Sequence, residues 1–247
     1  MKQKIKQLLQ NFFIKVFGYY FVKFEKPKPY IDCVKTIEVL LKYYNPKVLC
    51  DIGSNNGSWA YTLSNLGQGE LKHVTFFEPQ SKYQADLQKV EIGQANRVVF
   101  PIGLGNEQGE LEIKGGNACA SFLDFNESNA KDFEGTLLDE KEVKQVKSLD
   151  SVYEENSSLP IPDLIKIDVQ GFEYKVLQGA QKTLTKSKYV IIELALDTFY
   201  KGEARLWEIL KFMDENNFRL IDFGFIWRAQ YNINNKIAHI DAIFEKS

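Results

Sequence analysis

Short apolar runs alternate with longer segments of helical spacing along most of this chain, and this alternation constrains the fold more than any other feature. Five runs are predicted to be buried strands: 48–52, 73–78, 97–104, 163–168 and 189–194. Helices are predicted over 31–44, from about Ser58, and over 81–90, 172–186 and 203–217. Because each helix carries the chain back to the edge where the next strand begins, such alternation indicates a parallel sheet covered on both faces. The prediction is a doubly wound α/β fold.

The last part of the chain departs from this pattern. Two apolar runs, 218–224 and 238–244, follow each other with no helix between them, which predicts an antiparallel hairpin at one edge of the sheet. Residues 109–114 are a possible strand that extends the sheet. The stretch 115–147 is the least regular part and could hold a strand plus a loop that covers the substrate.

The N-terminal segment has a different character. Residues 2–24 carry apolar side chains at helical spacing together with several lysines, and two prolines follow at 27 and 29. We therefore expect N-terminal amphipathic helices over 1–45 and one cofactor-binding domain over 46–247. The basic amphipathic helix could pack on the domain, pair with a second subunit in a homodimer, or lie on a membrane surface.

Charge and cysteine content exclude several classes of protein. The formal net charge is -2, so no global positive field recruits nucleic acid. The three cysteines are widely spaced and form no C-x-x-C pair, which indicates neither a disulfide framework nor a zinc site.

No apolar run is long enough to span a membrane. We predict a cytoplasmic location, with possible peripheral contact at the inner membrane face.

The first predicted strand ends in the sequence DIGSNNG, residues 51–57. Open α/β sheets bind ligands at the carboxyl ends of their strands, so this loop is a candidate binding segment. Gly53 and Gly57 permit a tight turn and a close backbone approach. The spacing is not G-x-G-x-x-G, and Asp51 would oppose a pyrophosphate, whereas a ligand with an ammonium and a sulfonium tolerates it. Asp51 could also serve only to cap the turn.

The second predicted strand ends in Glu78. A carboxylate at this position accepts two hydrogen bonds from ribose hydroxyls in dinucleotide sites. The alternative is a solvated strand end before Pro79. Together with the first loop, Glu78 predicts a nucleoside ligand that lacks a diphosphate.

Two charged residues interrupt the buried strand DLIKID. Strand alternation places Lys166 and Asp168 on one face, and Glu193 ends the neighbouring strand YVIIEL. These three residues could form a catalytic cluster, or Lys166 could only neutralise a carboxylate inside the sheet. Glu173 suits the first turn of its helix on dipole grounds. We predict no metal site, since a third ligand is not apparent.

The histidines and the C-terminal aromatic residues carry weaker signals. His73 begins a strand, and His239 lies early in the last strand, so both are expected away from the carboxyl ends of the sheet. Four aromatic residues could line an acceptor cleft or be ordinary packing: Trp207, Phe225, Trp227 and Tyr231.

The chain resembles the FkbM family of S-adenosylmethionine-dependent methyltransferases over about residues 46–245. The resemblance lies in DIG with Gly57, in FEP at 77–79, in GLGN at 103–106, and above all in LIKIDVQGFEYKVLQGA followed by IIEL. It implies a seven-stranded Rossmann-like class I methyltransferase sheet with S-adenosylmethionine as cofactor. Asp51, Gly53, Asn55 and Gly57 would surround the methionine part, Glu78 would hold the ribose, and Gly103 and Leu104 would lie near the adenine. Many family members carry an acid where this chain has Gln170.

The resemblance implies methyl transfer to an oxygen nucleophile. We therefore predict an O-methyltransferase that acts on a hydroxyl of a sugar, a glycan (possibly lipid-linked) or a related natural product, with Asp168, Glu193 and Lys166 as catalytic candidates. Two alternatives remain at this point. One is an NAD-dependent oxidoreductase on a related sheet, which the lack of G-x-G-x-x-G disfavours. The other is a non-catalytic, membrane-associated scaffold.

Overall fold

A computed structural model of the protein describes residues 31–116, 118–126, 140–228 and 236–247. The amphipathic segment predicted over residues 2–24 and the proline connector after it lie outside the described residues. The predictions of membrane contact and of a dimer through that segment therefore lie outside them as well.

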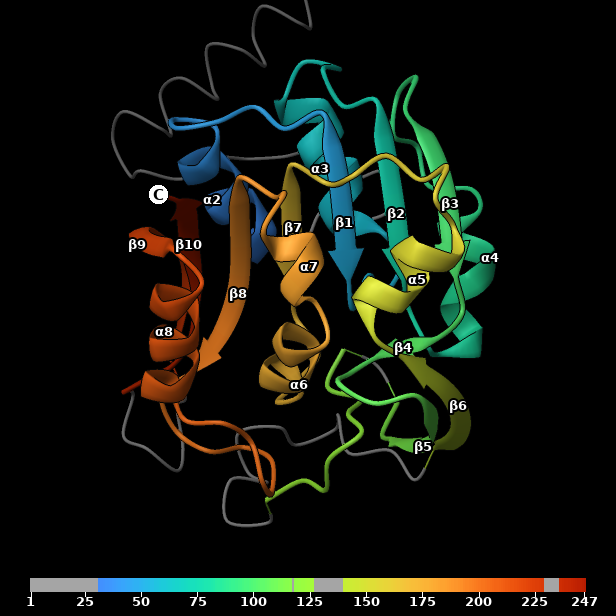
Figure 1. Ribbon diagram of the computed structural model, residues 1–247, viewed down its shortest axis with the longest axis vertical. Helices are drawn as coiled ribbons and strands as arrows, with labels where there is room; N and C mark the ends of the chain where they lie inside the picture. Colours follow the sequence, from blue (N-terminus) through green and yellow to red (C-terminus); the bar gives the residue numbers. More distant parts are fainter. Residues whose placement is uncertain (1–30, 117, 127–139, 229–235) are drawn as a thin grey trace, which may run out of the picture.

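A seven-stranded sheet forms the centre of the domain, with the strand order β3-β2-β1-β7-β8-β10-β9 (Figure 1). Its strands are β1 (Val48–Ile52), β2 (His73–Phe77), β3 (Asn96–Phe100), β7 (Leu164–Ile167), β8 (Tyr189–Ala195), β9 (Phe218–Arg228) and β10 (Ile237–Lys246). The first five pair in parallel, while β10 runs antiparallel to both β8 and β9. The prediction of a mainly parallel, doubly wound sheet with an antiparallel C-terminal pair is confirmed.

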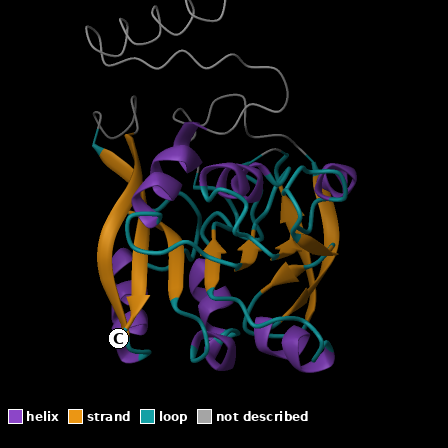
Figure 2. Cartoon of the chain, turned by 90° about the horizontal axis from the view of Figure 1, so that it is seen from above, coloured by secondary structure: helices purple, strands orange, loops and turns teal. Residues whose placement is uncertain are grey.

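Helices cover both faces of the sheet (Figure 2). One layer consists of α2 (Ile31–Leu40), α3 (Ser58–Leu66) and α4 (Gln84–Leu87), which follows a 3₁₀ turn over Ser81–Tyr83. The other consists of α5 (Leu149–Glu155), α6 (Glu173–Gln178), α7 (Gln181–Leu184) and α8 (Leu206–Glu215). Each layer buries its own apolar cluster against the sheet, which explains why the central strands are apolar on both faces.

The helix α2 belongs to this packed body. Its Ile37 and Leu40 are fully buried in the same cluster as residues of α3 and the central strands. The Thr36 hydroxyl accepts a hydrogen bond from the backbone N–H of Phe225 at 2.9 Å. The second of the two predicted N-terminal helices therefore shares the core of the sheet, and the boundary at residue 45 stays a prediction.

A separate small sheet corrects two strand predictions. It has the order β4-β6-β5, with β4 at Gly103–Leu104, β5 at Gly109–Lys114 and β6 at Lys141–Lys147. The predicted strand 97–104 ends at Phe100, because Pro101 has no N–H with which to continue the ladder. Residues 109–114 do not extend the main sheet but pair with β6.

Two helix predictions also need correction. The segment predicted as one helix over 172–186 is divided into α6 and α7 at Gly179. A side chain at Gly179 would place its Cβ only 2.0 Å from the carbonyl oxygen of Gly105, so this position packs backbone against backbone. The helix α5 was not predicted; Ser148 caps it by accepting a hydrogen bond from the backbone N–H of Ser151 at 3.1 Å.

The reversed direction of β10 places His239 where it was not expected. His239 pairs with Ala195 at the end of β8, so it lies at the carboxyl ends of the parallel strands. The prediction that His239 lies away from those ends is wrong, because an antiparallel strand begins where its parallel neighbours finish. His73 pairs with Val48 at the start of β1, so its predicted place at the opposite end is confirmed.

Candidate active site

A cavity of about 260 Å³ opens at the carboxyl ends of the central strands. The loops after β1, β2 and β7 line it, together with residues of β8, β9 and β10. Such a position, outside the carboxyl ends of an open α/β sheet, is where this class of fold binds its ligands. Its two parts are named here for the roles that the resemblance predicts: a cofactor half, with Gly53, Asn55, Glu78, Gly103 and Leu104, and an acceptor half, with Asp168, Gln170, Glu193, His239 and Asp241.

The loop after β1 brings bare backbone to the cofactor half. Gly53 has φ +73°, and a Cβ there would lie 1.8 Å from the carbonyl oxygen of Asp168, so only glycine fits between these two loops. Asn55 also has a positive φ, of 48°. Gly57 and Asp51, which the resemblance also assigns to the cofactor, are not among the residues that line the cavity. Asp51 is fully buried behind it.

Glu78 is a buried carboxylate at the end of β2, with a relative exposure of 3%. One oxygen accepts the backbone N–H of Asn55 at 2.8 Å, and the other accepts that of Gln80 at 2.9 Å. Burial raises the pKa of this carboxyl. Each oxygen keeps a second lone pair, so the group is fixed in place and can still accept a ribose hydroxyl. The alternative of a solvated strand end is wrong.

The residues of the cofactor half fit an adenosyl nucleoside. Glu78 suits the ribose diol, the open backbone at Gly53 suits the methionine part, and Leu104 provides an apolar wall. A Cβ on Gly103 would lie 2.5 Å from the ring of Phe122, so glycine at this position leaves space for an aromatic wall. The predicted assignments of Gly103 and Leu104 to the adenine remain predictions.

Lys166 connects the cofactor half to the acceptor half. Its ammonium donates to the carbonyl oxygen of Gly53 at 2.8 Å, and it lies 3.3 Å from the Asp168 carboxylate and 3.5 Å from that of Asp51. Burial favours the neutral amine, but Asp168 and Asp51 outweigh it and hold the pKa of Lys166 above its ordinary value. Burial also raises the pKa of Asp51. The ion pair considered in the sequence analysis is therefore present.

Gln170 connects the two carboxylates of the acceptor half. Its Nε2 donates to Asp168 and to Glu193, each at 2.9 Å, and its Oε1 lies 3.0 Å from the Tyr200 hydroxyl. Both hydrogens of the amide are used, because a carboxylate can only accept. Asp168 and Glu193, predicted as neighbours, are brought together in this way.

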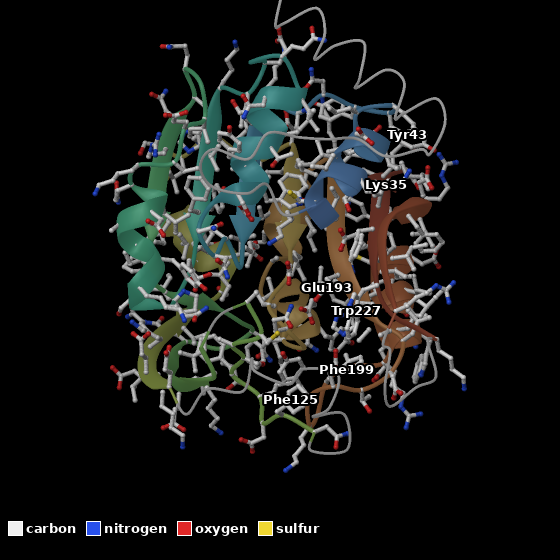
Figure 3. The ribbon with its side chains drawn as sticks, turned by 180° about the vertical axis from the view of Figure 1, so that it is seen from behind. Lys35, Tyr43, Phe125, Glu193, Phe199 and Trp227 are labelled. Carbon is white, nitrogen blue, oxygen red and sulfur yellow. The ribbon has the colours of Figure 1, made fainter. Side chains whose placement is uncertain are left out.

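His239 completes the acceptor half. Its Nδ1 lies 3.4 Å from Glu193, and its ring meets that of Phe199 edge-on at a centroid distance of 4.6 Å. Burial favours the neutral imidazole, but Glu193 outweighs it and raises the pKa of His239 to about 9. In Figure 3, Glu193, Phe199 and Trp227 lie close together in this region. The predicted antiparallel pair of C-terminal strands was the signal that could have placed His239 here.

Glu173 supports the loop after β7 from behind the cavity. Its carboxylate accepts the backbone N–H of Val169 at 2.9 Å and that of Gly171 at 3.2 Å. Burial raises the pKa of Glu173 to about 8, with a further contribution from Glu203. The residue lies in the first turn of α6, as predicted, and it also fixes the segment that carries Asp168 and Gln170.

Removing the Glu78 carboxylate is expected to weaken binding of S-adenosylhomocysteine by about 1–3 kcal/mol, which is roughly 5- to 150-fold in Kd. The reason is the loss of the acceptor that fits the ribose. Isothermal titration calorimetry measures the change. Glu78→Gln keeps one oxygen acceptor and should lose less than Glu78→Ala, while Glu70→Ala at an exposed position should lose nothing. Equal affinity in wild type and Glu78→Ala would contradict the assignment.

The elevated pKa of His239 predicts a loss of stability in alkali. The folded protein holds this proton more tightly than an ordinary histidine with pKa 6.5, so the stabilisation is complete below pH 6.5 and disappears as the pH rises through about 9. Burial raises the pKa values of Glu173 and Asp241 to about 8. The stability that their neutral forms provide is likewise lost as the pH rises, and this loss is complete at a lower pH than for His239. Urea unfolding of wild type and His239→Gln across this range should show a stability difference that shrinks by up to about 3 kcal/mol. A difference that is independent of pH would contradict the ion pair.

The strand order, with β10 inserted antiparallel between β8 and β9, and the acid at the end of β2 define a Rossmann-like class I methyltransferase domain. The family profile "Methyltransferase FkbM domain" matches residues 51–220. The chain therefore belongs to the FkbM methyltransferase family, as the resemblance indicated. S-adenosylmethionine is the cofactor of this domain.

Two characterised relatives are similar to this chain at modest identity. The 2-O-methyltransferase NoeI of Sinorhizobium fredii is 26% identical over 194 residues, covering 75% of this chain and 78% of the relative. The hexuronic acid methyltransferase AglP of Haloferax volcanii is 28% identical over 170 residues, covering 68% of this chain and 64% of the relative. The aligned region is thus less than two thirds of AglP.

Among solved structures, the FkbM methyltransferase from Methylobacillus flagellatus KT has 15% identity and a TM-score of 0.49, covering 82% of this chain and 45% of that one. Magnesium protoporphyrin IX methyltransferase from Synechocystis PCC 6803, solved with bound SAM, has 12% identity and a TM-score of 0.47, covering 98% and 97%. Both scores lie below 0.5, and the fold assignment rests on the strand order and the family profile.

Two kinds of feature are absent from the described residues. They hold no group of three or more metal-ligating side chains arranged to bind a metal ion. None of their helices has the length and apolar character needed to cross a membrane.

Proposed function

We propose that this protein is an S-adenosylmethionine-dependent O-methyltransferase whose acceptor is a hydroxyl of a sugar, a glycan or a related natural product. One observation carries the proposal: two carboxylates, Asp168 and Glu193, both accept hydrogen bonds from the Gln170 amide and lie in the same cavity as the buried Glu78. The name of NoeI describes methylation of an oxygen, and the name of AglP describes methylation of a hexuronic acid, which is a sugar acid. Together the two names support a hydroxyl of a carbohydrate as the acceptor.

S-adenosylmethionine, when bound, supplies a methyl group on a positively charged sulfur. The chain's own residues align the reactants, and alignment accounts for much of the rate in an in-line displacement. Glu78 holds the nucleoside, and the backbone at Gly53 lets the ligand approach closely. Lys166 fixes this loop by donating to the carbonyl oxygen of Gly53, and its positive charge compensates the carboxylates of Asp51 and Asp168.

Glu193 is the group we assign as general base. As the acceptor oxygen bonded to the methyl carbon, the carbon–sulfur bond would break with its electron pair remaining on sulfur. The acceptor oxygen would then carry the positive charge, and its proton would become strongly acidic. A carboxylate beside it can take that proton and stabilise the developing charge. Both carboxylates have a cationic neighbour, His239 for Glu193 and Lys166 for Asp168. We choose Glu193 because it pairs with β10 and lies beside the part of the cavity that β9 and β10 line. Asp168 is assigned to orienting the acceptor, and Lys166 to positioning Asp168.

The alternatives raised by the sequence receive less support. Membership of a methyltransferase family removes the case for an NAD-dependent oxidoreductase. The scaffold alternative, a lipid-linked acceptor and peripheral membrane contact all depend on the N-terminal segment, which lies outside the described residues. A cytoplasmic location also stays a prediction.

Transfer of an isotopically labelled methyl group tests the proposal. Incubating the protein with methyl-labelled S-adenosylmethionine and a panel of pyranosides should give a new O-methyl signal in the NMR spectrum of one or more sugars. Label on nitrogen or carbon of other acceptors, with none on any sugar oxygen, would contradict the proposed function.

A further inference from the structure

The hydrogen-bonding capacity of the acceptor half is mostly for accepting. The carboxylates of Asp168 and Glu193 have side-chain exposures of 35% and 22% and can only accept. The amide of Gln170 spends both of its hydrogens on these two carboxylates. A ligand here must therefore bring donors, and sugar hydroxyl groups are donors.

The cationic side chains of the cavity are already matched by acids. Lys166 and His239 are the only lysine and histidine that line it in the described part of the chain, and no arginine there does so. Lys166 lies within ion-pair distance of Asp51 and Asp168. His239 pairs with Glu193. A ligand carboxylate would thus meet cations that already have acidic partners. To pair with one of these cations it would have to displace the acidic partner, which would remain nearby and repel it.

The acids of the cavity outnumber these cations. Four acidic residues line the cavity: Glu78, Asp168, Glu193 and Asp241. Asp241 lies opposite Glu193 in the strand register and accepts a hydrogen bond from the Thr36 hydroxyl. Burial and the neighbouring Glu193 raise the pKa of Asp241 to about 8, so near neutral pH the excess of acids over cations in the cavity rests on Glu78, Asp168 and Glu193. An additional anion placed among these groups would be repelled, because like charges brought together in a desolvated site cost several kcal/mol.

Aromatic rings provide the apolar part of the acceptor half. Phe225 and Trp227 on β9 line the cavity, and the Trp227 ring lies 5.5 Å from that of His239. An aromatic face of this kind suits the C–H face of a sugar ring, while the carboxylates suit its hydroxyl edge. Both surfaces favour an uncharged ring.

We infer that the sugar ring bearing the accepting hydroxyl is uncharged, and that the protein discriminates against a hexuronate at this position. The inference rests on the proposed function and specifies its substrate class. It follows from the matched cations, the excess of acids and the aromatic wall, and it predicts selectivity by charge and not by size.

Matched trios of substrates test this inference. For the gluco, galacto and manno configurations, kcat/KM is measured near neutral pH with the neutral methyl glycoside, the corresponding uronic acid, and the methyl ester of that uronic acid. The neutral glycoside is expected to exceed the uronate by at least roughly tenfold in the configuration that reacts best. The ester has the size of the uronate without its charge, and it should regain most of the difference.

A uronate that reacts as well as its neutral partner would overturn the inference and leave the proposed function standing. An ester as poor as the uronate would also overturn it, because size would then be the cause. Transfer to no sugar of any kind would overturn both. These three failures are distinguishable in one set of assays.

One variant tests the charge from the side of the protein. Gln170→Glu, assayed with a chelator present, places a third carboxylate beside Asp168 and Glu193 and should raise the neutral-to-uronate ratio further. Gln88→Glu makes the same change at an exposed position outside the cavity and should leave the ratio unchanged. A ratio that falls in Gln170→Glu would contradict a charge-based selectivity.

Discussion

Replacing Glu193 with glutamine is expected to reduce turnover by about two to four orders of magnitude, which is the usual contribution of general base catalysis. Glutamine has nearly the same shape and can keep a hydrogen bond with Gln170, but it cannot take the proton of the acceptor hydroxyl. Because Glu193 lies in the acceptor half, the Kd of S-adenosylhomocysteine should stay within a factor of about two. Initial rates at saturating cofactor and sugar measure kcat.

The same substitution at a remote position controls for nonspecific effects. Glu215 on α8 is largely exposed and contacts Lys211, so Glu215→Gln should retain the wild-type rate. Retention of most activity in Glu193→Gln would show that the base is another group. Asp168→Asn would then be the variant to compare, since Asp168 is the other carboxylate held by Gln170.

Replacing Lys166 with methionine is expected to lower the free energy of unfolding by about 3–5 kcal/mol, as is typical when one member of a buried ion pair is removed. Asp51 is fully buried, and within the described residues neither of its carboxylate oxygens accepts a hydrogen bond. Lys166 is the cation that compensates its charge. Urea unfolding near neutral pH, followed by circular dichroism, measures the change.

A double substitution separates charge from packing. Asp51→Asn together with Lys166→Met removes both charges, so the double variant should be more stable than Lys166→Met alone. Lys211→Met, at an exposed position on α8, should change stability little. Stability losses that simply add in the double variant would contradict the charge pairing of Asp51 with Lys166.

The central sheet could be predicted because its strands are apolar on both faces and separated by helical segments. A strand over 109–114 and another within 115–147 could also be predicted, but not the separate sheet that they form, since β5 and β6 are mostly exposed and the irregular stretch separates them in the chain. The break between α6 and α7 was also hidden. It depends on the approach of Gly179 to the Gly105 backbone, and a tertiary contact of this kind leaves no periodic signal in the sequence.

The site could be predicted where it lies on loops that follow parallel strands. The sequence placed Asp168 and Glu193 at adjacent strand ends, and the structure brings them together. It did not identify Gln170 as their connection, because the orientation of an amide depends on both partners and on a backbone with φ 56°. His239 was misplaced because the direction of the last strand was not carried through to the position of its first residues.

The most direct test of this account is a crystal structure of the protein with S-adenosylhomocysteine and the neutral sugar that reacts best. We expect the ribose hydroxyls to donate to Glu78 and the accepting sugar hydroxyl to donate to Glu193, with the sugar ring against Trp227. A ribose bound away from Glu78, or a reactive hydroxyl directed away from Glu193, would contradict it.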